Sequence, residues 1–226
     1  LWASRNIAHV LSTAAPDTDG LVVPVAERVH RSFDKAFSVF EGGFRRPFLG
    51  AGKEGRAEFG RAYHMTYKGL SAHAQGKTFV RTGRALTLSI HRARSAVKDT
   101  DVRHLRLLPG QAELLHFDGL TPLHWRSKLA RMTSAFERGG GPPVPRHRQR
   151  QIAALRNENA GLYPRLKGPD AKLQEALTAH GLWAEPAFDP SAAVMRYFPD
   201  NPHDLTPQAF DRWLCANTDR SYIPDS

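Results

Sequence analysis

The feature that most constrains this chain is a short strand-like segment that turns directly into an amphipathic helical pattern. Residues 112–117 form the segment, and Gly119 follows it. From 123 to 136 the apolar positions recur at helical spacing, with basic residues between them. Thr121 is placed to cap this helix, and Pro122 suits its first turn. The pattern predicts a strand, a tight turn and a helix, and therefore an α/β domain.

Other segments upstream have the pattern of short elements. Residues 6–12 end a predicted helix, and 21–25 form a continuous branched run that is typical of a strand covered on both faces. Residues 77–81 and 86–91 alternate between two faces, which predicts two more strands. The stretch from 37 to 67 is rich in glycine, aromatic residues and arginine without a clean period. We interpret it as irregular strands and loops around a site.

A glycine and proline break follows the predicted helix. Residues 139–143 read Gly-Gly-Gly-Pro-Pro, and Arg146, Arg148 and Arg150 come at once after them. Patterns near 173–181 and 206–215 predict two further helices, with Cys215 as a core residue. The predicted organisation is an α/β domain over residues 1–137, a linker over 138–150 and a small helical tail over 151–226.

The charge of the chain is strongly positive. Among 226 residues, 32 Lys and Arg stand against 22 Asp and Glu, a net charge of +10. This excess predicts an anionic partner: nucleic acid, a membrane surface or substrate phosphates. The one cysteine excludes an intrachain disulfide and fits a reducing compartment, so we expect a cytoplasmic location. Because the chain opens at Leu1 directly into periodic sequence, we also expect it to be part of a longer protein.

Two groups of polar residues are candidates for a site. His116 and Asp118 stand where the 112–117 strand ends, the edge at which open α/β sheets bind ligands. A histidine there can ligate a divalent metal and an aspartate can orient it; alternatively, the histidine buttresses the turn and the aspartate caps it. Upstream, Lys77 and Arg81 share one strand face and form a candidate clamp for phosphate or carboxylate oxygens. The alternative is a solvated basic edge strand.

Residues 114–125, Leu-Leu-His-Phe-Asp-Gly-Leu-Thr-Pro-Leu-His-Trp, and residues 75–83, Gln-Gly-Lys-Thr-Phe-Val-Arg-Thr-Gly, carry a resemblance to a known family. Together they resemble the C-terminal half of bacterial family 2 glycosyltransferases, whose members carry a Gly-Lys-Ser/Thr-x-x-Arg segment and then a His-Phe-Asp block. Residues 16–25 are similar to the helix-turn-strand that follows the acidic motif of such enzymes. The resemblance covers about residues 6–136 and implies a partial GT-A-like mixed sheet with flanking helices, followed by the tail.

The resemblance also implies a function. It implies transfer of a sugar from a nucleotide-sugar donor to a polysaccharide, lipid-linked or envelope acceptor, in the cytoplasm or peripherally at the inner membrane. A divalent cation, Mn or Mg, would neutralise the leaving diphosphate. Together with the pattern of strand faces, the resemblance implies roles for six residues. Asp118 would be the catalytic residue and His116 the metal ligand. The substrate-binding residues would be Lys77, Arg81, Arg84 and His91.

The sequence departs from the family at the acidic motif. In GT-A enzymes an Asp-x-Asp motif follows a hydrophobic strand, whereas here Asp17 and Asp19 precede their strand, and Asp99 and Asp101 follow a basic stretch. Both triplets are interpreted as turns or caps. We therefore expect the donor-binding half to lie outside this chain, and the isolated chain need not be an active enzyme.

A non-catalytic basic module that binds nucleic acid or anionic surfaces is the rival hypothesis. Its candidate contacts are Arg146, His147, Arg148 and Arg150, beside the glycine and proline break. The sequence has no recognisable helix-turn-helix, RNA-binding or zinc pattern that would read a sequence. We therefore expect no specific nucleic-acid partner.

Overall fold

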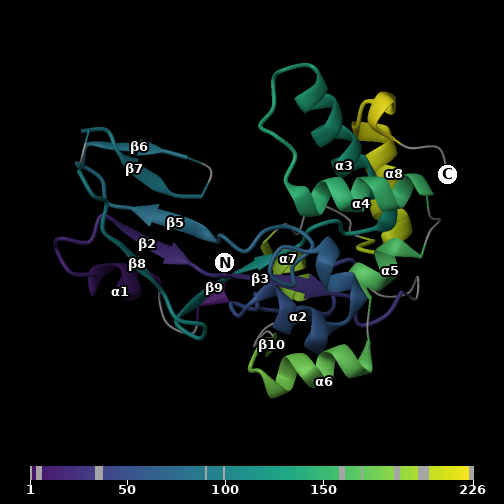
Figure 1. Ribbon diagram of the computed structural model, residues 1–226, viewed down its shortest axis with the longest axis horizontal. Coiled ribbons are helices and arrows are strands. Elements are labelled where there is room, and N and C mark those ends of the chain that lie inside the picture. Colours follow the sequence, from purple (N-terminus) through teal and green to yellow (C-terminus); the bar gives the residue numbers. More distant parts are fainter. Residues whose placement is uncertain are drawn as a thin grey trace. The chain divides into compact units, whose positions relative to one another are not determined.

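The computed structural model combines helices and short strands in a mixed α/β architecture (Figure 1). It describes residues 2–3, 7–33, 38–89, 91–98, 100–157, 161–168, 170–185, 189–197 and 204–223. Asn6, Ile90 and Asp99, which belong to predicted segments, lie outside these residues. The chain divides into two compact units: residues 1–26 with 73–116, and residues 27–72 with 117–226.

The first unit contains most of the predicted strands. Their positions agree with the alternating and branched runs of the sequence, with ends displaced by up to three residues. Its elements are β1 (Trp2–Ala3), α1 (Ile7–Ser12), β2 (Gly20–Val23), β5 (Lys77–Val80), β6 (Leu86–Leu88), β7 (Ala93–Ser95), β8 (His104–Arg106) and β9 (Ala112–His116).

A small mixed sheet organises this unit. Strand β2 lies between β5, with which it pairs antiparallel, and β8, with which it pairs parallel. Strands β6 and β7 form a separate antiparallel pair, and β1 pairs with β9. Leu21 and Val23 of β2 are buried with Val10 of α1, Leu107 and Ala112. Residues 21–23 of the branched run are thus a core strand, as their composition predicts, whereas Pro24 ends β2 and Val25 begins the next strand.

The second unit holds most of the helices. Strand β3 (Val25–Val29) passes from the first unit into the second at residue 27. The remaining elements are β4 (Gly43–Arg45), α2 (Gly52–Phe59), the 3-10 helix η1 (Arg61–Met65), α3 (Pro122–Glu137), α4 (Arg146–Asn157), α5 (Leu162–Lys167), α6 (Ala171–Ala179), β10 (Trp183–Ala184), α7 (Pro190–Tyr197), α8 (Pro207–Asn217) and the 3-10 helix η2 (Arg220–Tyr222).

Helix α3 begins as the sequence predicts. The Thr121 side chain accepts a hydrogen bond from the backbone N–H of His124, and Pro122 fills the first turn. The preceding Gly119 has φ of +69°, and a Cβ there would lie 2.6 Å from Cβ of Trp125. Two independent reasons therefore require glycine at position 119: the backbone conformation disfavours a side chain, and there is no room for a Cβ atom.

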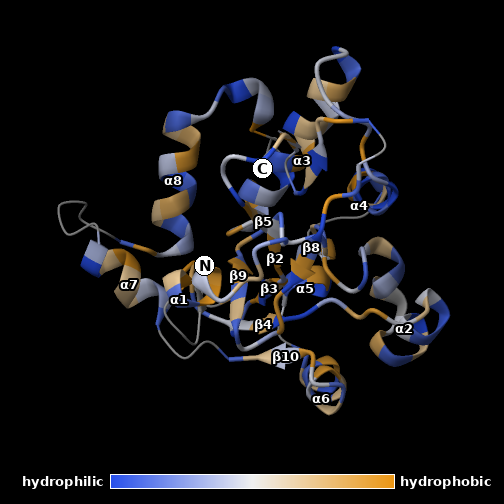
Figure 2. Cartoon of the chain, turned by 90° about the vertical axis from the view of Figure 1, so that its left-hand side faces the viewer, coloured by the Kyte–Doolittle hydropathy of each residue, from blue (hydrophilic) through white to orange (hydrophobic). Residues whose placement is uncertain are grey.

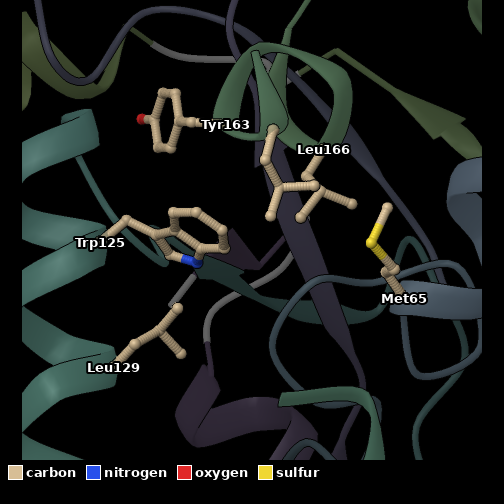
Figure 3. Packing of buried hydrophobic residues seen from close by; sticks show 6 residues of the cluster. Met65, Trp125, Leu129, Tyr163 and Leu166 are labelled. Carbon is tan, nitrogen blue, oxygen red and sulfur yellow. The ribbon is translucent and has the colours of Figure 1, made fainter. Parts of the chain in front are cut away.

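The apolar core of the second unit joins segments far apart in the sequence. Trp125 and Leu129 of α3 pack with Tyr163 and Leu166 of α5 and with Met65 (Figure 3). Trp125 is fully buried. Helices α6 and α8 combine hydrophobic and hydrophilic residues along their length, as helices with one face on a core do (Figure 2). The core therefore depends on the segment after residue 150.

This arrangement corrects the predicted organisation. Arg146–Arg150, expected in a linker, lie in the first turns of α4. The expected helical tail is not separate, because β10 pairs with β4 and α5 completes the core of the same unit. Sequence periodicity describes one element at a time, so it did not reveal that residues 27–72 and the tail share one core.

Two smaller findings complete the fold. Cys215, expected in a core, is exposed on α8, where Leu214 is the buried residue. Within the described ranges, no helix is long and apolar enough to cross a membrane.

Candidate functional site

Arg81 and Arg84, two of the residues predicted to bind substrate, bind a turn of their own unit instead. Arg81 donates from Nε to the Thr18 carbonyl at 3.0 Å, and from Nη2 to the Ala15 carbonyl at 3.2 Å. Arg84 donates to the Pro16 carbonyl at 2.7 Å. These hydrogen bonds stabilise the turn before β2, so both arginines have a structural role.

Lys77 lies at the opposite end of β5 from Arg81, in register with Val23 of β2. The hydrogen bonds of Arg81 are directed to the turn before β2, so the structure does not assemble these two cations into a common clamp. Their proposed roles in substrate binding stay predictions.

Three histidines gather in the first unit. The ring centroid of His73 lies 4.3 Å from that of His91 and 5.1 Å from that of His116. His91 Nδ1 lies 3.0 Å from the Gly76 carbonyl, and since that oxygen only accepts, Nδ1 carries the proton. The structure thus brings together two predicted site residues, His91 and His116, through a histidine that the sequence analysis did not select.

The three histidines are not arranged as a binding site for the expected divalent cation. Among the described residues, no group of three or more His, Cys, Asp or Glu is placed to hold a metal ion. The role of His116 as a ligand of Mn or Mg therefore stays a prediction.

Asp118 is the centre of a buried ionic network in the second unit. Arg148 of α4 donates from Nη2 to both carboxylate oxygens at 2.9 Å, and Lys128 of α3 donates to Oδ1. Lys167 of α5 adds a contact of 3.3 Å to Oδ2, and the Ser71 hydroxyl lies 3.2 Å from the same atom. Asp118 is 2% exposed. The carboxylate joins three helices and lies away from solvent.

A second carboxylate, Glu27 of β3, extends the network. Its Oε1 accepts from Arg45 of β4 at 2.8 Å and lies 3.2 Å from Lys167 Nζ. Oε1 also accepts the backbone N–H of Ser71 at 2.9 Å, and Oε2 accepts that of Ala72 at 2.7 Å. Lys167 therefore bridges Glu27 and Asp118. Glu27 and Lys167 could not be predicted from the sequence, since neither belongs to a recognisable motif.

The protonation of these carboxyls follows from their partners. Burial would raise the pKa of Asp118, but Lys167, Arg148 and Lys128 outweigh it and hold the pKa well below its usual range. Lys167 and Arg45 lower the pKa of Glu27 against the same effect of burial. A general base needs a pKa near the working pH and access to its substrate. The geometry thus gives Asp118 a structural role and argues against the predicted catalytic one.

A cavity of about 150 Å³ in the second unit combines an aromatic wall with polar groups. The Trp183 ring of β10 lies against Gly43 of β4, where a Cβ would be 2.0 Å from Trp183 Cζ2. Only glycine leaves room for the indole in this position. Asp170, Gln174 and Glu185 also line the cavity.

One side of this cavity is held by a buried histidine. His30 Nε2 lies 2.7 Å from Arg28 Nη2 and 2.6 Å from the Tyr163 hydroxyl. Since a guanidinium can only donate, Nε2 accepts and the proton of His30 is on Nδ1. Burial, with the charges of Arg28 and Lys167, lowers the pKa of His30 to about 2. His30 is therefore neutral at physiological pH.

The charged groups that line the cavity already have partners within the protein. Glu185 accepts from the indole N–H of Trp183 at 2.9 Å and pairs with Arg31 at 3.4 Å. Asp170 caps α6 by accepting from the Leu173 N–H at 3.1 Å. Trp183 and Gly43 were not selected from the sequence, since Gly43 lies in the aperiodic stretch and Trp183 in the expected tail.

No protein-family model, curated protein or solved structure matches this chain.

Proposed function

We propose that this chain is part of a glycosyltransferase, and that the cavity beside Trp183 binds a sugar ring of its substrate. The sequence blocks at 75–83 and 114–125 support the class of enzyme by resemblance. The observation that carries the proposal is the pairing of an indole wall with carboxylate and amide groups around a cavity of about 150 Å³.

The size and lining of the cavity suit a pyranose. A cavity of this volume holds one six-membered ring. The C–H face of a sugar is apolar and packs on an indole, whereas its hydroxyls both donate and accept. Gln174 can do both, and Asp170 and Glu185 accept. A few polar groups around an apolar wall are the usual composition of a small-molecule site.

A binding measurement with matched tryptophan variants tests the proposal. We expect hexoses or N-acetylhexosamines, titrated one at a time, to shift the Trp183 indole N–H signal in NMR spectra. Trp183→Ala should reduce the affinity at least tenfold. Trp213→Ala should not, because Trp213 is 58% exposed on α8 and lies outside the cavity lining. Absence of any sugar-dependent shift at millimolar concentrations would refute the sugar site.

The nucleic-acid hypothesis loses two of its candidate contacts. Arg148 and His147 are buried in α4, and Arg148 is paired with Asp118. Arg150 donates to the His64 carbonyl at 2.6 Å, so it too has a structural partner. We expect binding of a 20-mer oligonucleotide to be weak at 150 mM salt. Submicromolar affinity that falls steeply with salt and is lost in Arg146→Gln with Arg150→Gln would favour the rival.

A further inference from the structure

One face of the β5–β2–β8 sheet in the first unit carries an arginine and a histidine but no acidic residue. Side chains in register across a sheet point to the same side, as do those two residues apart along one strand. This face comprises Gly20 and Val22 of β2, Thr78 and Val80 of β5, and His104 and Arg106 of β8. Its polar groups therefore meet without a carboxylate among them.

A glycine on this face brings two of the side chains together. A Cβ at Gly20 would lie 2.8 Å from Cγ2 of Thr78 and 3.0 Å from Cδ2 of His104, so both side chains converge over the backbone of β2. Nε2 of His104 is a buried nitrogen without a hydrogen-bond partner in the described part of the chain. Leaving such a group unsatisfied costs about 1–3 kcal/mol, so a ligand that bonds to it would be stabilised here.

The turn between β6 and β7 adds a second arginine. Thr78 Oγ1 donates to the His91 carbonyl at 2.7 Å, which holds this turn at the face that contains Thr78. Arg92 is the next residue. Arg106 lies in the same row as Thr78, with Val22 between them, and the row is about 10 Å wide. Two arginine side chains can span that width, so their guanidinium groups can bind one ligand over Val22.

The charges of these two arginines are not compensated by a carboxylate. Among the described residues, neither the Arg92 nor the Arg106 guanidinium has an ion-pair partner. Asp17 and Asp19, in the turn before β2, pair with other arginines. Burial and the positive charge of Arg92 lower the pKa of Arg106, whereas a carboxylate partner would raise it. The face is therefore electropositive.

We propose that Arg92, His104 and Arg106 form a binding site for a phosphate group. Guanidinium groups only donate hydrogen bonds, the imidazole can donate one, and the several oxygens of a phosphate accept them. The site belongs to the first unit, and the proposal assumes nothing about the sugar cavity of the second unit. The phosphate can come from a small soluble ester or from a lipid headgroup, since both present the same kind of oxygens.

Titration of the full chain with inorganic phosphate, followed by NMR, tests this inference. We expect the Nε–H signals of Arg92 and Arg106 to shift to saturation. Arg92→Gln with Arg106→Gln should weaken binding at least tenfold. Arg131→Gln with Arg156→Gln removes the same charge from exposed positions on α3 and α4 and should have little effect.

Two results of this titration would overturn the inference. One is the absence of a saturable shift up to about 10 mM phosphate. The other is equal weakening by both pairs of substitutions, because binding would then follow net charge alone. Arg92 and Arg106 are exposed, so circular dichroism of their double variant should match that of the parent chain and exclude loss of fold as the cause.

A substitution of the histidine separates a defined site from a diffuse positive charge. His104→Phe keeps an aromatic ring beside Gly20 and removes no arginine, but it removes the imidazole nitrogens. It should weaken phosphate binding at least threefold, the effect of losing one hydrogen bond. Unchanged affinity in this variant would exclude His104 from the site.

Vesicles made of equal parts of phosphatidylglycerol and phosphatidylcholine distinguish the two sources of phosphate. Cosedimentation that requires Arg92 and Arg106 and is reduced by inorganic phosphate assigns the site to a lipid headgroup. Saturable phosphate binding without such cosedimentation assigns it to a soluble ester. Because the sugar titration reports on Trp183, a negative result in either experiment leaves the other proposal standing.

Discussion

The guanidinium of Arg148 donates to both carboxylate oxygens of Asp118 at 2.9 Å, and both side chains are buried. The sequence alone predicts Arg148 in a linker and Asp118 in a catalytic site. Their pairing instead fixes α4 to the turn before α3. Burial of a charge is tolerated only with such a partner, so each residue accounts for the presence of the other.

The pairing predicts a large loss of stability when the cation is removed. Arg148→Gln should lower the free energy of unfolding by about 3–5 kcal/mol, the usual cost of breaking a buried ion pair. Arg146→Gln, on the same helix but exposed, should change it by less than about 0.5 kcal/mol. Urea denaturation followed by circular dichroism measures both. Equal effects of the two substitutions would show that the pair does not stabilise the fold.

The buried network also predicts the direction of the pH dependence. The pKa values of Glu27, Asp118 and His30 are all lowered in the folded chain, so the unfolded chain binds more protons as the pH falls. The stability contribution of His30 is complete above its unfolded pKa of about 6.5 and decreases below it. That of the two carboxylates decreases below about pH 4.5.

The urea midpoint should therefore fall from pH 7 to pH 5 and more steeply from pH 5 to pH 3. His30→Gln should flatten the upper part of this curve. Glu175→Gln, an exposed carboxylate on α6, serves as the control and should leave the curve unchanged. A midpoint that rises on acidification would contradict the assigned directions.

Gly119→Ala should lower the stability of the fold by more than the cost of placing alanine in the backbone conformation of residue 119. A residue with a side chain pays about 1 kcal/mol or more at φ of +69°, and here its Cβ would also collide with Trp125. Gly181 has φ of +66° with open space around it, so Gly181→Ala isolates the backbone cost. We expect the first substitution to lower the melting temperature at least twice as much as the second.

Arg81→Ala should loosen the turn before β2. The variant loses the bonds to the carbonyls of Thr18 and Ala15, so the amides of residue 15 and of residues 17–20 should exchange with solvent about five- to tenfold faster, the effect of losing about 1 kcal/mol of hydrogen bonding. Hydrogen exchange by mass spectrometry detects this. Arg94→Ala, on β7, is the control. If the exchange rates of the turn do not change, Arg81 does not stabilise the turn, and its predicted role in binding substrate would be favoured instead.

Local signals in the sequence determined the individual elements. The cap at Thr121, the period of α3, the alternation in β5 and β6 and the branched run of β2 depend on neighbours within a few residues, and each predicted element is present. The α/β class followed from the order of these elements. The irregular stretch before residue 67 has no period, and its strand β4 and helix α2 were not predicted.

Only the tertiary structure decided which residues share a site. Arg45 donates to the Leu166 carbonyl 121 positions away, and Trp183 lies over Gly43. A contact at that separation leaves no periodic trace in either segment, because its free energy comes from burial and charge pairing that exist only after the chain has folded. For the same reason Asp118 was conspicuous as a motif residue, while its partners Lys167 and Arg148 resembled ordinary solvated cations.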